Sequence, residues 1–384
     1  MRYIFAALFF LLIGTISCNY VKNVKLLTGG KLDRENFQQK IPFTYNKKII
    51  VVEGQVNSDT TKRAFIFDTG AFNSKIEKSL ADSLGLKRVA TKDNSTAQGI
   101  SREIEVTRLN SLKLGETIFR NIGAGKLEYD ESSVSPCLAE HGLIGANLIK
   151  LAYWKIDYVN KELTFSDKAF IQDENKKTIQ LGFDRPLLSG VPDVDIKIGE
   201  REVKNVLFDI GYNGGIILPR NLSSFFKSDE ESNIIDYSTS GIYGTNLDTL
   251  TIKELEVGFD EPLATIPVEF SSLGKALIGN DFLEHFTVFI NYKKKIITLQ
   301  QESDIVIDEH ADFIPGMLSE DLWIVNRVKE GSKLALGDTL STVNEKKPKD
   351  IFSGKCDYFF GIRDFLDAEP LEVTTQDGKT IKLD

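Results

Sequence analysis

The sequence predicts a mostly β protein in which two similar β-barrel lobes are related by a pseudo-twofold axis and are followed by a small C-terminal β/α domain. Three observations support this fold class. A pair of short motifs recurs in the middle of the chain, most segments are apolar or alternating over strand-like lengths, and helical periodicity is scarce. The 384 residues are enough for two or three domains with a sizeable core.

The first residues are predicted to be an export signal. A short basic start precedes an apolar run over residues 3–13, which is too short to span a bilayer. Small residues then lead to Cys18. We therefore expect residues 1–17 to be a signal peptide and Cys18 to be the lipid attachment site of a lipoprotein anchored to a bacterial cell envelope membrane. Thr15 stands where this pattern prefers leucine, and ordinary secretion without a lipid is the alternative.

An internal repeat organises the middle of the chain. Leu143-Ile144-Gly145 recurs as Leu277-Ile278-Gly279, 134 positions later, and identities continue downstream at the same offset. Upstream, Phe67-Asp68-Thr69-Gly70 corresponds to Phe208-Asp209-Ile210-Gly211 at an offset of 141. Such a period is too long for a solenoid, so the repeat predicts a duplicated domain.

Both copies are predicted to contain strands in the same order. The predicted strands are residues 48–56, 64–67, 104–106 and 112–116 in the first copy, and residues 194–200, 203–208 and 252–257 in the second. A helix is predicted at residues 74–86, where apolar residues recur at helical spacing. Residues 18–40 are then a linker, residues 41–170 an N-terminal lobe and residues 171–302 a C-terminal lobe.

Residues 303–384 are predicted to form a third, compact domain. The expected elements are a strand at 321–328, a turn and strand at 336–344 and a short helix at 361–366. The succession Gly-Ser, Gly-Asp and Val-Asn at residues 331–332, 337–338 and 343–344 resembles that of bacterial PDZ domains. This resemblance implies a PDZ-like domain.

Composition excludes several function classes. The chain has 47 Lys and Arg against 56 Asp and Glu, a net charge of −9, so nothing favours binding to nucleic acid. It has three His and three Cys and lacks the HExxH, paired CxxC and GK[ST] motifs. No metal and no cofactor are therefore expected.

Two cysteines remain once Cys18 is set aside. Cys137 and Cys356 are far apart in the sequence and fall in what are predicted to be different domains. We expect two buried free thiols, and a disulfide formed in an oxidising compartment is the alternative.

Each copy of the repeat places an aspartate on a tight loop directly after an apolar strand, in Asp68-Thr69-Gly70 and Asp209-Ile210-Gly211. One such loop is typical of an ordinary turn. Two at matching places in a duplicated domain would let a twofold axis bring Asp68 and Asp209 together. Carboxyl groups in contact share one proton, so one can act as general base on a water while the other polarises a peptide carbonyl.

These loops, together with the two Leu-Ile-Gly segments, resemble the two lobes of an aspartic endopeptidase. Each lobe is more similar to the retropepsin-like half than to a full pepsin lobe, because the spacing from Asp to Leu-Ile-Gly is short. The resemblance covers residues 40–300, and a PDZ-like domain behind them is similar to exported retropepsin-like proteases of bacteria. It implies that Asp68 and Asp209 are catalytic and that Thr69, Gly70, Ile210 and Gly211 support their loops.

The resemblance also implies how substrate is held. An extended peptide would lie in a cleft between the lobes, beneath flaps around Gln98-Gly99-Ile100 and Gly241-Ile242-Tyr243-Gly244, although both segments equally fit plain hairpin turns. Because both lobes belong to one chain, we expect a monomer.

The second loop departs from the family pattern. The family has Thr or Ser after each aspartate, whose hydroxyl hydrogen-bonds across the axis, and Ile210 has none. A catalytically weak or inactive peptide-binding module at the membrane is therefore the alternative, while the presence of both carboxylates favours the enzyme. His141, His285 and His310 lack a Ser or Cys nucleophile motif and are expected to be structural.

Overall fold

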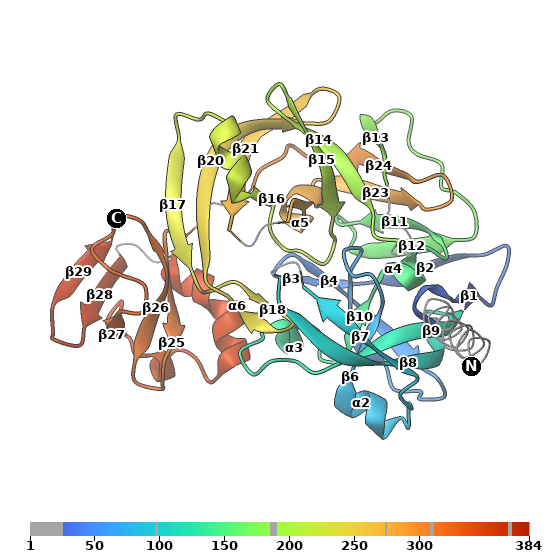
Figure 1. Ribbon diagram of the computed structural model, residues 1–384, viewed down its shortest axis with the longest axis horizontal. Coiled ribbons are helices and arrows are strands. Elements are labelled where there is room, and N and C mark those ends of the chain that lie inside the picture. The colour runs from blue at the N-terminus through green and yellow to red at the C-terminus, as the bar shows by residue number, and fades with distance from the viewer. Residues whose placement is uncertain are drawn as a thin grey trace, which may run out of the picture.

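The computed structural model describes residues 26–96, 99–184, 190–272, 275–307, 311–367 and 371–383. Strands predominate throughout these residues (Figure 1), which confirms a mostly β protein. Cys18 and residues 1–17 lie outside the described residues, as does Gln98. None of the described helices is long and apolar enough to cross a membrane.

The first sheet is formed by the N-terminal half of the chain. Its described strands follow the order β1-β9-β6-β10-β5-β4-β8-β7, and β3 pairs with β4. These strands are β1 (Lys31–Leu32), β3 (Thr44–Asn46), β4 (Ile49–Val56), β5 (Arg63–Phe67), β6 (Lys75–Glu77), β7 (Ala90–Ser95), β8 (Ser101–Leu114), β9 (Thr117–Leu127) and β10 (Gly142–Ile144). The helices of this half are α2 (Lys78–Ser83), α3 (Ser135–Leu138) and α4 (Ala146–Ile149).

The helix predicted at residues 74–86 is wrong in its first part. Residues 75–77 form β6, because pairing with β9 on one side and β10 on the other holds them extended. The helix begins only at Lys78. The carboxylate of Glu77 caps it by accepting hydrogen bonds from the backbone N–H groups of Ser79 and Leu80, both at 2.7 Å.

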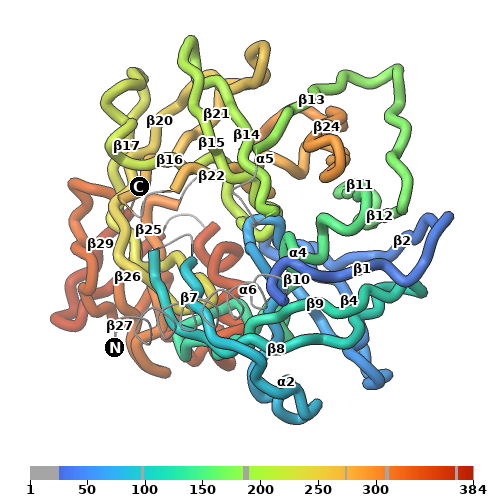
Figure 2. The backbone as a smooth tube through the Cα atoms, turned by 45° about the vertical axis from the view of Figure 1, so that its right-hand side comes forward, coloured from blue at the N-terminus to red at the C-terminus, as the bar shows by residue number. Residues whose placement is uncertain are grey.

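A second sheet contains strands from both halves of the chain. Its order is β13-β24-β23-β11-β12-β2. These strands are β2 (Gln38–Pro42), β11 (Tyr153–Asp157), β12 (Glu162–Ser166), β13 (Thr178–Gly182), β23 (Phe286–Asn291) and β24 (Ile296–Gln301). In Figure 2 the labelled strands of this sheet run from β13 and β24, beside the second half, through β11 and β12 to β2 in the first half.

The register of this shared sheet reflects the sequence repeat. At its centre β11 pairs with β23, with Trp154 opposite Ile290 and Ile156 opposite Val288. In the repeat, Trp154 corresponds to Val288 and Ile156 to Ile290. If each residue is replaced by its equivalent in the other copy, the pair Trp154–Ile290 becomes the pair Val288–Ile156 and the reverse also holds. A twofold relation between the copies gives this pattern.

The third sheet combines the second half of the repeat with the C-terminal region. Its order is β14-β15-β22-β16-β21-β20-β17-β26-β27-β28-β29, with β25 beside β26. The strands from the repeat are β14 (Asp193–Ile198), β15 (Arg201–Phe208), β16 (Ile216–Pro219), β17 (Glu231–Asp236), β20 (Asp248–Gly258), β21 (Pro262–Ser271) and β22 (Leu277–Ile278). Those from the C-terminal region are β25 (Phe313–Met317), β26 (Trp323–Lys329), β27 (Thr339–Val343), β28 (Leu371–Thr375) and β29 (Thr380–Leu383).

The remaining described elements are short, apart from one C-terminal helix. They are the two-stranded ribbon of β18 (Ser240–Gly241) and β19 (Gly244–Thr245), and the helices η1 (Arg220–Phe225), α5 (Asn280–Leu283), η2 (Pro348–Asp350) and α6 (Lys355–Leu366). Helix α6 contains the predicted helix at 361–366 and begins six residues earlier.

Two hydrophobic cores correspond to these regions. The large one joins both halves of the repeat and includes Phe67, Trp154, Phe208 and Phe286, all fully buried. A separate cluster around Trp323 lies wholly within the C-terminal region, which packs α6 against its own strands. The C-terminal region thus has a core of its own.

The C-terminal region is nevertheless joined to both halves of the repeat. Its strand β26 pairs with β17, and the two lie side by side in Figure 1. A disulfide connects Cys356, in α6, to Cys137, in α3, with their Cα atoms 5.3 Å apart. Beside it the Lys355 ammonium donates to the carbonyls of Glu131 and Ser133 at 2.9 and 2.7 Å. The expectation of two free thiols was wrong, because the sequence does not reveal that α6 packs back against the first half.

Candidate functional site

Asp68 and Asp209 occupy matching positions in the two halves. Each directly follows a strand that ends in a fully buried phenylalanine, Phe67 of β5 or Phe208 of β15, and that strand pairs in parallel with the short Leu-Ile strand of the same copy, β10 or β22. The Asp68 N–H donates to the carbonyl of Ile144, and the Asp209 N–H donates to that of Ile278, both at 3.0 Å. The motifs that define the repeat thus hold the two aspartate loops in the same way.

A second pair of hydrogen bonds repeats this correspondence. The N–H of Ala146 donates to the carbonyl of Ala71 at 2.8 Å, and that of Asn280 donates to the carbonyl of Tyr212 at 2.9 Å. Both bonds tie the far end of an aspartate loop to the first residue of a short helix, α4 or α5. Each loop is therefore fixed at both ends.

The two aspartate side chains meet. Their carboxyl groups lie close enough that each changes the pKa of the other. The approach depends on glycine, because a Cβ built on Gly70 would overlap the Asp209 carboxyl and one built on Gly211 would overlap that of Asp68. The structure thus brings together the two aspartates that the sequence singled out, and it explains the glycine in each loop.

The surroundings of the pair favour its protonated form. Burial raises the pKa of Asp209 well above its ordinary value, and the neighbouring Asp68 charge raises it further. Burial also raises the pKa of Asp68, against the opposing effects of the Lys75 charge and of the Ala71 N–H, which donates to its Oδ1 at 2.7 Å. Asp209 is 8% exposed and Asp68 is more open to solvent. The pair therefore holds one proton above the pH at which separate carboxylic acids lose theirs.

Thr69 connects the two loops through its hydroxyl. The hydroxyl donates to the carbonyl of Phe208 at 2.7 Å and accepts from the N–H of Ile210 at 3.0 Å. Ile210 is fully buried in the main core and has no hydroxyl with which to return these bonds. The cross-loop connection predicted from the sequence is thus made from one side.

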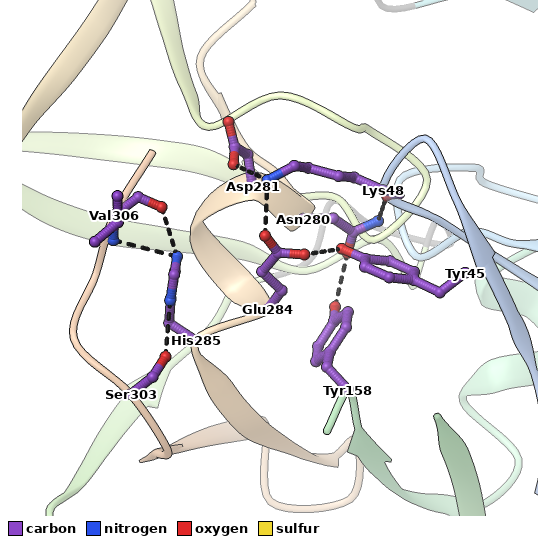
Figure 3. A network of polar contacts seen from close by, with 9 residues as sticks. All are labelled: Tyr45, Lys48, Tyr158, Asn280, Asp281, Glu284, His285, Ser303 and Val306. Atoms are coloured by element: carbon purple, nitrogen blue, oxygen red, sulfur yellow. Dashed lines mark hydrogen bonds and ion pairs between the residues drawn. The ribbon is translucent and has the colours of Figure 1, made fainter. Parts of the chain in front are cut away.

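A buried amide on the Ile210 side makes a different connection. Asn280 donates to the carbonyl of Ile210 at 2.7 Å. It also donates to the carbonyl of Lys48 and accepts from the Tyr158 hydroxyl, both at 2.7 Å (Figure 3). Lys48 and Tyr158 belong to the first half of the chain, and Ile210 to the second. Asn280 therefore tethers the second aspartate loop to the first half, although it belongs to no motif that sequence reasoning examined.

The hairpin between β3 and β4 reinforces this tether. Its Lys48 ammonium forms ion pairs with Asp281 and with Glu284, the latter at 2.7 Å, and Tyr45 donates to Glu284 at 2.8 Å (Figure 3). Burial would lower the pKa of Lys48, but the two carboxylates outweigh it and the pKa is raised. The lysine therefore remains charged where it crosses between the halves.

The hairpins that carry the two segments expected to be flaps contact each other. Gly99 and Ile100 lie in the turn between β7 and β8, where the Thr96 N–H donates to the Ile100 carbonyl at 2.9 Å. Tyr243 lies at the tip of the β18–β19 ribbon, where its hydroxyl accepts from Asn94 of β7 at 2.9 Å and its ring packs under Arg102 of β8. The two hairpins are therefore joined across the halves.

Two described histidines have structural partners. The His141 ring accepts from the Ala64 N–H at 3.2 Å, and burial lowers its pKa. The His285 ring contacts the Ser303 hydroxyl at 2.9 Å and the Val306 carbonyl at 2.8 Å (Figure 3). His310 lies outside the described residues.

The sequence reasoning missed two lysines beside the segment that follows the Asp68 loop. Lys75 had been assigned to a helix, and the structure instead places it in β6, where its charge acts on Asp68. Lys92, in β7, donates to the side chain of Asn73 at 2.5 Å. A buried strand position occupied by lysine was the signal that could have drawn attention to Lys75.

Comparison with known proteins finds a family match in the half of the chain that contains Asp68. Residues 52–148 match the family model described as aspartyl protease, and they include Asp68 and Leu143–Gly145. This gives the chain an aspartyl protease-like domain. No curated protein matches the chain significantly.

Proposed function

We propose that the protein is an aspartic endopeptidase, in which Asp68 and Asp209 together activate a water for peptide hydrolysis. The contact between the two carboxyl groups is the observation that carries this proposal. The family match of residues 52–148 independently favours peptidase chemistry. Of the two described histidines, His141 accepts from a backbone N–H, and His285 contacts the Ser303 hydroxyl but is bonded through its other ring nitrogen to the Val306 carbonyl rather than to a carboxylate.

The proposed chemistry uses one shared proton. The ionised carboxylate takes a proton from a water as the water oxygen attacks the peptide carbonyl carbon, and the protonated carboxyl donates to the carbonyl oxygen. A tetrahedral diol results. The carboxyl group that took the water proton then gives it to the amide nitrogen, the other carboxylate takes a proton from one diol hydroxyl as the C–N bond breaks, and the pair again holds one proton. The raised pKa of Asp209 suits the role of acid in this sequence.

The alternative function is a catalytically weak or inactive peptide-binding module. The observation that favours it is the missing hydroxyl at Ile210. Thr69 makes its cross-loop bonds without reciprocation, so the second loop depends on the Asn280 tether and on apolar packing. We favour the enzyme, because both carboxylates are present and Asn280 holds the second loop by bonding the Ile210 carbonyl.

Cleavage of an unstructured protein such as casein tests the proposal. The full mature chain should cleave it between about pH 4 and 7 without any effect of chelators, and Asp68→Asn or Asp209→Asn should each lower the rate at least about a hundredfold. Asp229→Asn changes an exposed aspartate remote from the loops and is the matched control. Full turnover by either active-loop variant would refute the assignment. Peptide binding without cleavage by the wild type would favour the binding module.

We further propose that the protein is exported and anchored through Cys18, that residues 303–384 form a PDZ-like domain, and that the chain acts as a monomer. The Cys137–Cys356 disulfide fits an oxidising compartment outside the cytoplasm. A strand-rich C-terminal region with its own core and helix α6 suits a PDZ-like unit. In a detergent phase separation the wild type should enter the detergent phase and Cys18→Ser should not. Equal partitioning would point to secretion without a lipid.

A further inference from the structure

Two lysines from different elements converge on the segment that follows the Asp68 loop, and the charge of one of them, Lys75, acts on Asp68. Lys75 lies in β6, seven residues after Asp68 in the sequence, and Lys92 lies in β7, on the hairpin that carries the first expected flap. Asn73, on the chain between Asp68 and Lys75, accepts a hydrogen bond from the Lys92 ammonium at 2.5 Å. This bond fixes the hairpin lysine beside the aspartate loop.

Lys75 is a buried cation without a conventional partner. Three lysines are classed as buried in the described part of the chain, namely Lys75, Lys126 and Lys253, at 6%, 7% and 7% exposed. Lys126 pairs with Asp82 at 2.6 Å, and Lys253 pairs with Glu231 at 3.0 Å. Among the described residues no ion pair or hydrogen bond reaches the Lys75 ammonium, and the carboxylate that acts on it is Asp68.

The free-energy cost of burying Lys75 without an ion-pair partner among the residues that the structure describes indicates that this lysine has a function. A buried charge without a close partner destabilises a fold, and Lys126 shows that this sheet readily supplies partners. Lys92 also lacks a carboxylate within ion-pair distance in the described residues. Its ammonium rests 5.0 Å from the centre of the Phe72 ring, and burial and the Lys75 charge lower its pKa to about 7.

Burial lowers the pKa of Lys75, as it does that of Lys92, although the Asp68 charge opposes this effect on Lys75. When both lysines are protonated they carry two positive charges, beside an aspartate pair that carries a single negative charge with one shared proton. The whole chain has a net charge of −9. One additional carboxylate beside Lys75 and Lys92 would balance the site.

We propose that Lys75 and Lys92 form a subsite for a glutamate or aspartate side chain of the substrate, within two residues of the scissile bond. This inference rests on the proposed peptidase function. An extended peptide advances about 3.3 Å per residue, so a side chain that reaches a lysine adjacent to Asp68 must belong to a residue close to the bond being cleaved. An electrostatic effect on Asp68 alone would explain Lys75, but it would not explain why a second lysine is held there by the hairpin.

Internally quenched peptides that differ at one position provide the test. In a sequence that the enzyme cleaves, Glu or Gln is placed in turn at each of the three positions on either side of the scissile bond. Rates are compared as kcat/KM at about pH 5.5, where the peptide carboxylate is ionised. We expect Glu to exceed Gln by about tenfold or more at one position, the range of a hydrogen bond between charged groups.

Variants identify the lysines as the cause. Lys92→Gln and Lys75→Met should each reduce the Glu to Gln ratio toward one, and Lys92→Glu should reverse it in favour of a peptide with Lys at that position. The ratio is taken within each variant, so a general loss of activity cancels. Lys87→Gln removes an exposed lysine just before the same hairpin and should keep the wild-type ratio.

A binding measurement separates this inference from the proposed function. Fluorescein-labelled Glu and Gln peptides are titrated with the full chain carrying Asp209→Asn. If the wild type cleaves none of the peptides, but the Glu peptide binds the Asp209→Asn chain more tightly than the Gln peptide and Lys92→Gln in that background abolishes the difference, peptidase activity is refuted and the acidic subsite stands. If peptides are cleaved without any Glu preference, or if the preference survives both lysine variants, the subsite is refuted and the peptidase stands. Equal binding without cleavage refutes both.

Discussion

The hydroxyl of Thr69 accepts the backbone N–H of Ile210 at 3.0 Å, so one side chain holds the opposite aspartate loop without a matching hydroxyl in return. The same hydroxyl donates to the carbonyl of Phe208, on the other side of Asp209. Two bonds from Thr69 thus bracket Asp209, while the backbone around Asp68 receives no hydroxyl from residue 210. The two aspartates are equivalent in sequence but are held differently.

Exchanging these residues tests the asymmetry. Ile210→Thr places a hydroxyl where it can bond across to the first loop, so turnover should stay the same or rise while peptide binding stays nearly unchanged. Thr69→Val removes both existing bonds, and unfolding should become easier by about 1–3 kcal/mol, together with a large loss of turnover. Steady-state cleavage of one peptide and thermal unfolding measure both effects. If Ile210→Thr switches cleavage on in an otherwise inactive protein, the natural chain is a binding module.

Removing the Asn280 amide should disturb the second loop. Asn280→Ala leaves the carbonyls of Ile210 and Lys48 and the Tyr158 hydroxyl without this partner, so we expect a loss of about 3 kcal/mol in stability and a drop in kcat larger than the change in KM. Tyr158→Phe removes one of the three bonds and should cost about 1 kcal/mol.

A variant far from the loops controls for lost stability. Asn344→Ala deletes a side chain that accepts from the Glu372 N–H at 2.9 Å in the C-terminal region. It should lower the melting temperature with little change in kcat. Equal effects of Asn280→Ala and Asn344→Ala on kcat would show that Asn280 has no particular role in positioning.

The buried aspartate pair should make the protein less stable as pH rises. The pKa of Asp209 is raised in the folded state, so between its ordinary and its raised pKa the folded chain holds a proton that the unfolded chain has lost. Stability from this group is therefore complete at low pH and declines as pH increases through that interval. Asp209→Asn abolishes the titration, so its melting temperature should exceed that of the wild type by more at pH 7 than at pH 4. A constant difference across this range would contradict the raised pKa.

Opening the disulfide should loosen the C-terminal region. Replacing both Cys137 and Cys356 with Ala removes a covalent connection across a long stretch of chain, and a loss of about 2–4 kcal/mol is expected. Pairing of β26 with β17 remains, so the region should still fold but should be cleaved faster by trypsin. Unchanged proteolysis would mean that strand pairing alone holds the region in place.

The aspartate loops were predictable because the chain contains them twice. A single Asp-Thr-Gly is weak evidence, but its match to Asp209-Ile210-Gly211, with Leu-Ile-Gly downstream of both, indicated where the two loops would meet. The structure brings Asp68 and Asp209 into contact as expected. The repeat also indicated that Ile210 would leave the connection incomplete.

Contacts without a local pattern were not predictable. Asn280 bonds Lys48, 232 residues away in the chain, and Ile210, 70 residues away. Neither separation corresponds to the period of a helix or a strand. The same holds for Cys137 and Cys356, whose pairing depends on how the C-terminal region packs against the first half. Lys75 was misassigned because the apolar spacing of residues 76–86 fits a helix, whereas pairing with two neighbouring strands outweighed that local preference.

Because β17 pairs with β26 in one sheet, folding of this sheet depends on a part of the chain that is synthesised late. Strand β17 leaves the ribosome long before its partner, so until the last part of the chain is made it presents unpaired N–H and C=O groups along one edge. A nascent chain that halts before β26, or a shortened chain ending at residue 302, would expose this edge together with an unpaired Cys137 thiol. Such an intermediate is prone to self-association. Synthesis of the complete chain before folding, as in export of an unfolded precursor, would avoid that state.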